Sequence, residues 1–434
     1  MSIDYAARRA RIAPALGLTD EILLVGSGFQ QQKPEISDMM LPYSAHQEYY
    51  YLTGHADAMG GVIAYDPKPR PDRHGPGDGG WTSFVPEVTE ADRVWEGREQ
   101  LPGEPLGKFP AWLEARQGRR VVMLGAPVPG ALPDVIRSAE VREAFKHARR
   151  PKEPGEIELM RRCAAMTAAG YAAVQPFLKP GITERRIQVE LEAEYFRQGA
   201  AKTGYDSIVG TGPNAAVFHG SPSSRAAQEG EFILIDSGAE LERYVIDVTR
   251  TYIAGKPSAF QRDLHQVVLN AELRAIASCR PGAEWKDIHF AAAVDLIGGL
   301  VDMGVMKGAA ASLVEQEAHM LFFPHGIGHM LGLGVRDAGG MEPGRTKDPR
   351  PSLKSLRQDL ILRPGYIVTI EPGLYFIPAL LNDPSRREKF RNDVNWPLAE
   401  KMIGIGGVRI EDNILVTAGA PENLTAAIPK GLPV

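Results

Sequence analysis

The first 150 residues carry short apolar runs separated by polar turns, a pattern that predicts a mixed α/β domain. Five runs stand out, at 21–26, 49–54, 60–65, 81–85 and 120–125. Gly, Pro and Asp punctuate these runs, as is typical of the turns between strands. A polar segment rich in Pro and Gly, 66–80, interrupts them, and we expect an exposed loop there.

The pattern changes at 149–158, where two prolines, a glycine and dense charge indicate a domain junction. Beyond it, stretches rich in Ala, Leu and Met predict helices. They are expected at 155–178, from the N-cap Thr183 to about Gly199, at 258–279 and at 284–304. Strands are expected at 231–236, 244–253, 366–371 and 407–416. We therefore expect an α+β protein with two domains, 1–150 and 151–434.

Composition and charge exclude several classes of protein. The 434 residues are 44% hydrophobic and 24% charged, which suits a globular chain with a large core. The formal charge of −5 gives no basic excess for nucleic acid or an anionic membrane, and no apolar run is long enough to span a bilayer. The N-terminus lacks the apolar stretch of a signal peptide. Two cysteines, Cys163 and Cys279, exclude a disulfide framework and favour a cytoplasmic location.

Two aspartates lie beside apolar runs in a way that predicts a hairpin. Asp236 ends the run FILID, Asp247 lies within YVIDVTRTY, and ELER between them is the expected turn. A hairpin centred on Leu241–Glu242 would place the two aspartates directly opposite each other, with Cβ atoms about 4.5–5.5 Å apart. Two bare carboxylates at that distance repel each other, which raises one pKa. A bound cation would remove the repulsion, so the pair predicts a metal site.

Two glutamates and a histidine extend this acidic set. Glu371 ends the strand YIVTIE before a proline. Glu411 is expected within the strand GVRIEDNILV, with Arg409 two residues earlier and therefore on the same face. His329 lies in PHGIGHMLGLG, whose glycines allow close backbone approach, so that a loop can present both His325 and His329.

Each of these features alone has a commoner structural explanation. An Asp at a strand end usually caps a turn, and Arg409 with Glu411 could be a surface ion pair worth under about 1 kcal/mol. Their joint occurrence beside apolar runs favours a site. Four carboxylates and one imidazole would be balanced by two divalent cations, and this donor set suits Mn²⁺, with Co²⁺ or Zn²⁺ as alternatives. Two cations sharing a water would supply a hydroxide for hydrolysis of a carbonyl bond.

The motifs IDSGAE, YVIDVTRTY, HGIGHMLGL, TIEPGLYF and GGVRIEDN resemble the five metal-ligand motifs of the pita-bread metallopeptidases. With AVFHG at 216–220 they are similar to the branch of that family that cleaves beside proline. SAHQEYYYLTG and DRVWEGR resemble the creatinase-type N-domain of the same branch. The resemblance covers nearly the whole chain. It implies a creatinase-type α/β N-domain over 1–150 and a pita-bread catalytic domain over 151–434.

The resemblance also implies roles for individual residues. The metal ligands would be Asp236, Asp247, His329, Glu371 and Glu411. Glu371 would also be the general base or proton shuttle. His325 and His219 would be catalytic, stabilising the oxyanion or binding substrate, although His219 could instead be a loop donor. The substrate-binding residues would be Arg357, Tyr375, Arg336 and Arg409, with Arg409 orienting the ligand carboxylates.

Two features resemble prolidase, the Xaa-Pro dipeptidase, more than aminopeptidase P. Forty positions separate Glu371 from Glu411, a longer connection than is typical of aminopeptidase P. Arg357 stands where prolidases carry an arginine for the substrate's C-terminal carboxylate, which a guanidinium fork suits. We therefore expect a dinuclear metal-dependent dipeptidase acting on Xaa-Pro dipeptides. The resemblance also implies a homodimer.

Several alternatives stay open. The first is an Xaa-Pro aminopeptidase that acts on longer peptides, and hydrolysis of organophosphorus esters could accompany either activity. A non-catalytic binding protein on the same fold would lack the ligands, all five of which are present. A nucleotide-binding oxidoreductase is disfavoured because GTGPNA at 210–215 lacks the required spacing.

The sequence departs from the family pattern at Arg336, which stands where the family usually has a His. It puts substrate preference in doubt, because Arg stays protonated.

Overall fold

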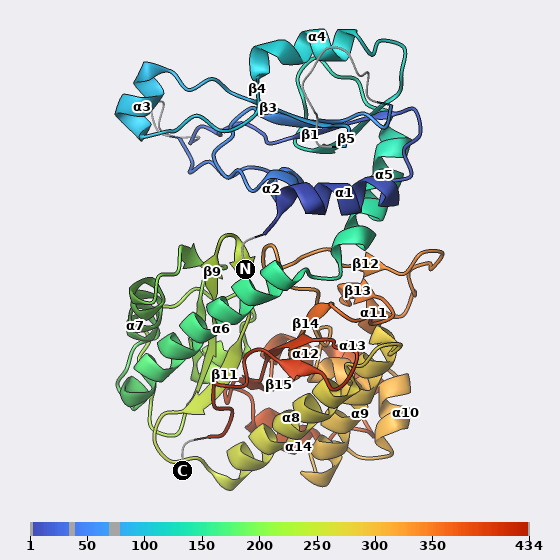
Figure 1. Cartoon of the computed structure of the whole chain (residues 1–434). Coiled ribbons are helices and arrows are strands. Elements are labelled where there is room, and N and C mark those ends of the chain that lie inside the picture. The colour runs from blue at the N-terminus through green and yellow to red at the C-terminus, as the bar shows by residue number, and fades with distance from the viewer. Residues whose placement is uncertain (1–2, 34–39, 69–78, 433–434) are drawn as a thin grey trace. The chain divides into compact units, whose positions relative to one another are not determined.

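The computed structural model describes residues 3–33, 40–68 and 79–432 of the chain. It divides into two compact units, one ending at Arg149 and the other beginning at Arg150 (Figure 1). Each unit has its own sheet and its own apolar core.

The N-terminal unit is built on a mixed five-stranded sheet with the order β4-β3-β2-β1-β5. Its strands are β1 (Ile22–Gly26), β2 (Val62–Tyr65), β3 (Trp81–Val85), β4 (Glu104–Pro105) and β5 (Val121–Gly125). β1 pairs antiparallel with β2 and parallel with β5. The helices are α1 (Tyr5–Ala15), α2 (Gln47–Thr53), α3 (Glu90–Glu96), α4 (Phe109–Glu114) and α5 (Val135–Arg149). The strands expected at 21–26, 60–65, 81–85 and 120–125 are thus confirmed.

The strand expected at 49–54 is wrong, because this run forms α2. Tyr49, Tyr50, Tyr51 and Leu52 are all buried, and the helix ends at Gly54 in the left-handed region, with φ 72°. A short continuous apolar run does not distinguish a buried helix from a buried strand, since neither shows alternation. The loop expected at 66–80 lies mostly outside the described residues, which omit 69–78.

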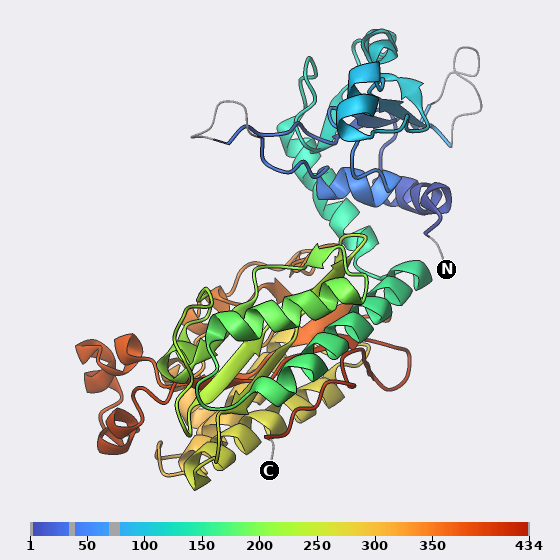
Figure 2. The same ribbon diagram turned by 90° about the vertical axis from the view of Figure 1, so that its left-hand side faces the viewer.

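Four long helices flank the sheets of the C-terminal unit, and all four were expected. They are α6 (Pro154–Val174), α7 (Glu184–Arg197), α8 (Ala259–Ser278) and α9 (Trp285–Asp302). The Thr183 side chain accepts a hydrogen bond from the Arg186 N–H, which confirms the expected N-cap. α6 packs on α7, and α8 packs on α9 (Figures 1 and 2). Within the ranges that the structure describes, no helix has the length and apolarity needed to cross a bilayer.

Shorter helices and several small sheets complete this unit. The helices are α10 (Ala310–Glu315), α11 (Pro351–Lys354), α12 (Pro378–Leu381), α13 (Pro384–Lys389) and α14 (Trp396–Lys401). One group of strands is β6 (Lys202–Thr203), β7 (Ile208–Thr211), β8 (Phe232–Asp236), β9 (Ala239–Leu241), β10 (Tyr244–Val245) and β11 (Thr249–Ile253). The other is β12 (Gly340–Met341), β13 (Gln358–Asp359), β14 (Ile367–Ile370), β15 (Gly373–Tyr375), β16 (Gly407–Arg409), β17 (Asp412–Leu415) and β18 (Glu422–Asn423).

Two strands expected to be continuous are interrupted. The run 244–253 forms β10 and β11 with a break at 246–248, and the run 407–416 forms β16 and β17 with a break at 410–411. On either side of each break the chain belongs to a different sheet, because β10 pairs with β9 whereas β11 pairs with β8. Asp247 and Glu411 therefore lie at sheet-switching points and not in mid-strand as expected.

The hairpin that carries the two aspartates has a register different from the expected one. Asp236 pairs with Thr249, and the turn is formed by Glu242 and Arg243 with φ of 49° and 68°. Positive φ at both turn residues matches the right-handed twist of the strands. The hairpin centre therefore lies one residue later than Leu241–Glu242. Asp236 and Asp247 remain on one face as diagonal neighbours, not as a directly opposed pair.

Candidate active site

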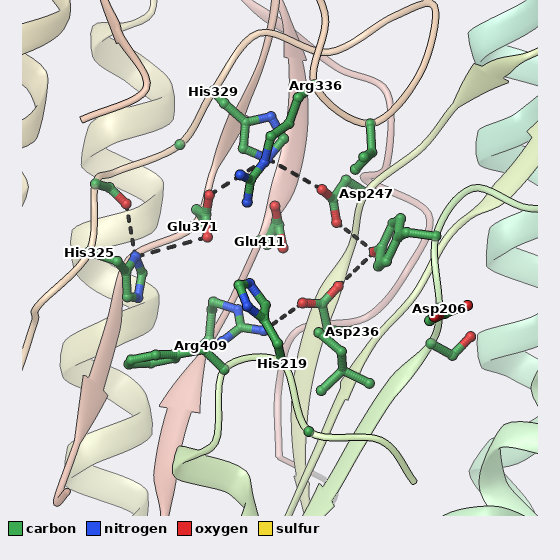
Figure 3. Close-up of a pocket in the computed structure, with 18 of the residues that line it drawn as sticks. Asp206, His219, Asp236, Asp247, His325, His329, Arg336, Glu371, Arg409 and Glu411 are labelled. Atoms are coloured by element: carbon green, nitrogen blue, oxygen red, sulfur yellow. Dashed lines mark hydrogen bonds and ion pairs between the residues drawn. The ribbon is translucent and has the colours of Figure 1, made fainter. Parts of the chain in front are cut away.

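A cavity of about 900 Å³ in the C-terminal unit gathers most of the expected site residues. Its lining includes the five expected ligands Asp236, Asp247, His329, Glu371 and Glu411, and also His219, His325, Arg336, Arg357 and Arg409 (Figure 3). The cavity lies within the range of about 300–1,000 Å³ that small-molecule sites occupy. The roles of these residues remain proposals, but the structure brings them to one place.

The two glutamates face each other across a β-ladder that changes sheets. Ile370 pairs with Asp412 on one side of the corner, and Gly373 pairs with Arg409 on the other. The same register runs through both pairs, so Glu371 lies opposite Glu411. Opposed residues project to one side of the ladder, which explains why both carboxylates enter the cavity.

Two glycines allow the backbone to place the ligands this closely. A Cβ on Gly238 would lie 1.7 Å from the carbonyl oxygen of Ile246, so the strands carrying Asp236 and Asp247 could not approach with any side chain there. A Cβ on Gly328 would lie 2.0 Å from the carbonyl oxygen of Thr369. The close approach expected of the glycines before His329 is therefore confirmed at Gly328.

The His329 ring is oriented with one nitrogen toward the carboxylates. Its Nδ1 lies 3.1 Å from the carbonyl oxygen of Met330, and its Nε2 lies 3.4 Å from Asp247 Oδ2 and 3.9 Å from Glu371 Oε1. When Nδ1 donates to Met330, the lone pair of Nε2 faces the acids. Burial disfavours the imidazolium, but the Asp247 and Glu371 carboxylates outweigh burial and raise the pKa of His329.

The carboxyl groups are held in an environment that opposes their ionisation. Burial raises the pKa of Asp236 to about 6, against the opposing charge of Arg409. Burial also raises the pKa of Glu371 to about 7, with Asp247 adding repulsion and His329 opposing it. For Glu411, burial and the Asp247 carboxylate raise the pKa well above its usual range. Without a cation, the cluster therefore retains protons near neutral pH.

Arg409 joins the acids to a second group of polar side chains. Its Nη2 donates to Asp236 Oδ2 at 2.6 Å, and its Nη1 lies 3.0 Å from the Tyr375 hydroxyl, which is 2.9 Å from His325 Nε2. Arg409 is only 4% exposed, which excludes the surface ion pair considered as the alternative. Tyr375 is fully buried and is not part of the cavity wall, so it reaches the site through His325 and Arg409.

Three polar residues at this site were missed in the sequence. The Tyr205 hydroxyl lies 2.6 Å from Asp236 Oδ1 and 2.5 Å from Asp247 Oδ1. Thr249 donates from its Oγ1 to Glu411 Oε2 at 2.6 Å. The Asn413 side chain accepts from the N–H of Asp247 at 2.9 Å and donates to the carbonyl oxygen of the same residue.

The remaining expected residues lie at the exposed wall of the cavity. His219, Arg336 and Arg357 all line it and are solvent-exposed. The structure gives no hydrogen bond or ion pair for the side chains of these three residues. They are therefore available to a ligand in the cavity.

Behind the site, a buried charge network connects a ligand strand to the C-terminal segment. Arg250 Nη1 donates to the carbonyl oxygen of Glu411 at 2.7 Å, and its Nη2 donates to Asp412 Oδ1 at 2.7 Å. Lys430 forms ion pairs with Asp412 and, at 2.7 Å, with Glu272. Burial and the Asp412 charge raise the pKa of Glu272 to about 9. The main chain of Glu411 is thus held from behind by groups that do not enter the cavity.

The donor set fits divalent cations. Asp247, His329 and Glu411 each offer one ligand atom, and these atoms lie within 4.8 Å of one another. Asp236 and Glu371 border the same space, and each carboxylate oxygen retains a second lone pair beside the hydrogen bond it accepts. Four buried carboxyl groups that oppose one another's ionisation are an arrangement that bound cations would stabilise.

Comparisons with known proteins agree with this chemistry. The family described as Metallopeptidase family M24 matches residues 158–418. A probable Xaa-Pro aminopeptidase of Tuber melanosporum (strain Mel28) is 30% identical over 422 residues, covering 94% of this chain and 89% of the relative. A second probable Xaa-Pro aminopeptidase, from Botryotinia fuckeliana (strain B05.10), is 30% identical over 414 residues, covering 91% and 87%.

Solved structures with the same fold extend the likeness to both units. Aminopeptidase PepP of Pseudomonas aeruginosa is 27% identical with a TM-score of 0.79, covering 99% of this chain and 96% of that one. E. coli aminopeptidase P with the inhibitor Pro-Leu is 25% identical with a TM-score of 0.79, covering 99% and 97%. The two-domain α+β, pita-bread architecture expected from the sequence is therefore confirmed. The fold and the match over 158–418 lead to one conclusion, that this chain belongs to metallopeptidase family M24.

Proposed function

We propose that this chain is an Xaa-Pro aminopeptidase, which hydrolyses the bond between the N-terminal residue of a peptide and a following proline. The observation that carries the proposal is the convergence of Asp236, Asp247, His329, Glu371 and Glu411 on one cavity. The names of the relatives support the longer-peptide activity, which the sequence placed second to the dipeptidase. The aminopeptidase activity is therefore the first candidate and the dipeptidase activity the second.

In this proposal two divalent cations, with Mn²⁺ as the first choice and Co²⁺ or Zn²⁺ as alternatives, are held by the five ligands. When bound, such cations polarise the scissile carbonyl and lower the pKa of a coordinated water. The homodimer and the cytoplasmic location expected from the sequence stay predictions.

The protein's own groups would then hold and move protons around the scissile bond. Glu371, whose pKa is raised to about 7 by burial in the cation-free cluster, is the candidate proton shuttle, because it lies beside His329 at the cavity wall. His325 has both ring nitrogens engaged, Nε2 with the Tyr375 hydroxyl and Nδ1 with the carbonyl oxygen of Gly326. It therefore has no free N–H for the oxyanion, and it would contact the substrate as part of the cavity wall. His219, which has no protein partner, would contact the substrate from the exposed wall.

Arg357 supports dipeptide hydrolysis as the second candidate. Its exposed side chain lines the same cavity and forms no ion pair with any residue that the structure describes. A guanidinium there would donate two parallel hydrogen bonds to the carboxylate of a C-terminal proline. A peptide that continues beyond proline has an amide at this point and gains nothing from the charge.

A comparison of substrate lengths decides between the two activities. The Mn²⁺-loaded chain is incubated with an Xaa-Pro dipeptide and with an Xaa-Pro-Xaa tripeptide, and kcat/KM is measured for each. The aminopeptidase proposal expects the tripeptide to be the better substrate and Arg357→Met to leave tripeptide hydrolysis unchanged. A preference for the dipeptide that disappears in Arg357→Met would establish the dipeptidase instead.

Glu371→Gln serves as the inactive control in both assays. Loss of the proton shuttle should lower kcat by about 10²–10⁴-fold. The unfolding temperature of the variant should equal that of the wild type, which would show that the fold is intact. Turnover that survives in this variant would remove Glu371 from that role.

A further inference from the structure

A second, smaller cavity lies in the C-terminal unit beside the catalytic one. It has a volume of about 230 Å³ and is formed by β12, β13, α11 and the first turn of α9, the first three of which lie together in Figure 1. This volume is below the range of about 300–1,000 Å³ typical of drug-sized ligands. An occupant would therefore be about the size of a single amino acid.

Gln358 lines this cavity with an amide group that has no partner. The residue is 2% exposed, and neither its Nε2 nor its Oε1 forms a hydrogen bond. A buried amide without partners is unfavourable, and such groups are normally satisfied. The structure leaves neither atom exposed to the cavity, so a ligand that carries both an acceptor and a donor would satisfy them once the Gln358 side chain turns toward it.

The charges around the cavity favour an anionic group. Lys286, Lys347 and Arg357 line it, and the structure gives none of the three an ion pair. Two acids also line it, but both are engaged elsewhere. Asp348 accepts from the backbone N–H of Arg350 at 3.0 Å, and Asp359 pairs with Arg345 at 2.7 Å. Lys286 lies close enough to Asp348 to help lower the pKa of that carboxyl, but three cations against two acids still leave a positive excess for a carboxylate.

The rest of the lining is apolar, with Leu353 4% exposed and Leu356 partly buried. We propose that this cavity is an accessory site for a free α-amino or imino acid. Its carboxylate would contact Lys286 and Arg357, its primary or secondary ammonium group would donate to Gln358 Oε1, and its aliphatic part would pack on the two leucines.

Arg357 couples this accessory site to the catalytic cavity, because it lines both. The segment 353–358 forms the wall between them. Ser355 faces the catalytic cavity, whereas Leu356 and Gln358 face the smaller one. A guanidinium drawn toward a carboxylate on one side is less available on the other. An occupant of the accessory site should therefore weaken the binding of an Xaa-Pro dipeptide, whose carboxylate would use Arg357, by a finite factor.

The coupling, though not the binding site itself, rests on hydrolysis of Xaa-Pro dipeptides, the second candidate activity proposed above. Hydrolysis of an Xaa-Pro bond releases the N-terminal amino acid and, from a dipeptide, proline. Either product carries the chemistry described above, so L-leucine and L-proline are the probes that distinguish the two sources.

Binding is tested on the full chain without metal, by equilibrium dialysis with radiolabelled L-proline and L-leucine. Gln358→Met and Lys286→Met should each weaken binding of at least one probe by about tenfold, as expected for a lost hydrogen bond to a charged group. Lys307→Met is the control, because Lys307 is exposed and lines neither cavity. Equal binding in the wild type and both variants, with unfolding temperatures unchanged, would overturn the proposal.

Kinetics test the coupling. If the amino acid competes within the catalytic cavity, the apparent KM rises without limit as its concentration increases. If it binds at the accessory site, the apparent KM rises only to a plateau, which the finite coupling factor sets. With an Xaa-Pro dipeptide as the substrate, we expect a plateau in the wild type, and Gln358→Met should need about tenfold more amino acid to reach it. A linear rise with the same slope in both proteins would refute the coupling. If no Xaa-Pro peptide is hydrolysed, the proposed function fails, but the dialysis result still decides whether the site exists.

Discussion

A single phenol hydroxyl is shared by two of the candidate metal ligands. Tyr205 lies within hydrogen-bond distance of both Asp236 and Asp247, yet it has one hydrogen to donate. Tyr205→Phe should lower the affinity for Mn²⁺ by about 10–100-fold, as is typical when a group that orients metal ligands is removed. Isothermal titration calorimetry measures this.

Tyr171→Phe is the matched control, since the Tyr171 hydroxyl is also buried but donates to the carbonyl oxygen of Val248 at 2.6 Å and lies 3.2 Å from that of Ile235. It should lower stability without a comparable loss of Mn²⁺ affinity. Equal losses of affinity in the two variants would mean that the Tyr205 hydroxyl acts only through folding.

The raised pKa values make the metal-free chain sensitive to pH. Asp236 and Glu371 have folded-state pKa values of about 6 and about 7, above the ordinary values of 3.8 and 4.5. Their contribution to stability is therefore complete below about pH 4 and is lost as the pH rises to about 7. Cation binding requires ionised carboxylates, so it strengthens over the same interval. The difference in unfolding temperature between Mn²⁺-loaded and metal-free protein should widen from about pH 5 to about pH 8; a constant difference would contradict this.

Arg336 tests whether the cavity wall sets substrate preference. Its exposed side chain lines the cavity, and the described part of the chain offers it no hydrogen bond or ion pair. Arg336→His should change KM or the preferred residue before proline while leaving Mn²⁺ content unchanged. Elemental analysis beside steady-state kinetics separates the two effects, and a parallel loss of bound metal would count against the assignment.

At the residue scale, the sequence revealed the ligands better than their supporting groups. Asp236 and Glu371 could be found because each follows an apolar run. Thr249 and Asn413 each lie two residues beyond a ligand. Because residues i and i+2 of a strand share one face, this spacing is the sequence signal that places them beside the ligands. Tyr205 gave none, because its contact with the aspartates depends on the pairing of Ile208 with Asp236.

At the scale of elements, the hairpin holding the aspartates depends on a glycine. Gly238→Ala would place a methyl group 1.7 Å from the carbonyl oxygen of Ile246, so the strands must separate. We expect a loss of about 3 kcal/mol of folding free energy, measured by urea denaturation, together with loss of Mn²⁺ binding. Gly419→Ala is the control, because the nearest atom to its Cβ would be 3.9 Å away. Comparable stability of the two variants would show that the hairpin tolerates the separation.

Helices were predicted more reliably than strand boundaries, for a physical reason. The N-cap Thr183 is a local signal, and it forms the expected capping bond. Ser258, at the start of the expected helix 258–279, also caps its helix. The breaks in the runs 244–253 and 407–416 are not local, since a strand changes sheets only where distant strands pair with it. The helix at 49–54 shows the converse limit, because burial on all sides removes the periodicity that identifies a helix.

At the scale of the whole molecule, the end of the chain supports the site. Lys430 lies between the buried carboxyl groups of Glu272 and Asp412. Lys430→Met would leave them without their shared cation, and we expect a loss of about 3–5 kcal/mol in unfolding free energy. Arg391→Met, which removes an exposed pair with Glu388, should lose under about 1 kcal/mol. Similar losses, measured by denaturant unfolding, would mean that the buried network contributes no more than a surface pair.

The family and the two-domain organisation could be inferred from sequence, because five motifs in a fixed order are specific. The length of the substrate could not be inferred from the sequence. It depends on which groups face the far end of the cavity, and the Arg357 motif and the names of the relatives support different answers.

The ladder that places Glu371 opposite Glu411 has a consequence for how such enzymes diversify. The residues between β15 and β16, which include α12–α14, leave and return at the same rung, where Tyr375 pairs with Gly407 (Figure 2). Their length is therefore uncoupled from the spacing of the two carboxylates. Insertions or deletions in this excursion can remodel the surroundings of the site while the rungs keep the acids in position, so selection can alter what is cleaved without rebuilding how it is cleaved.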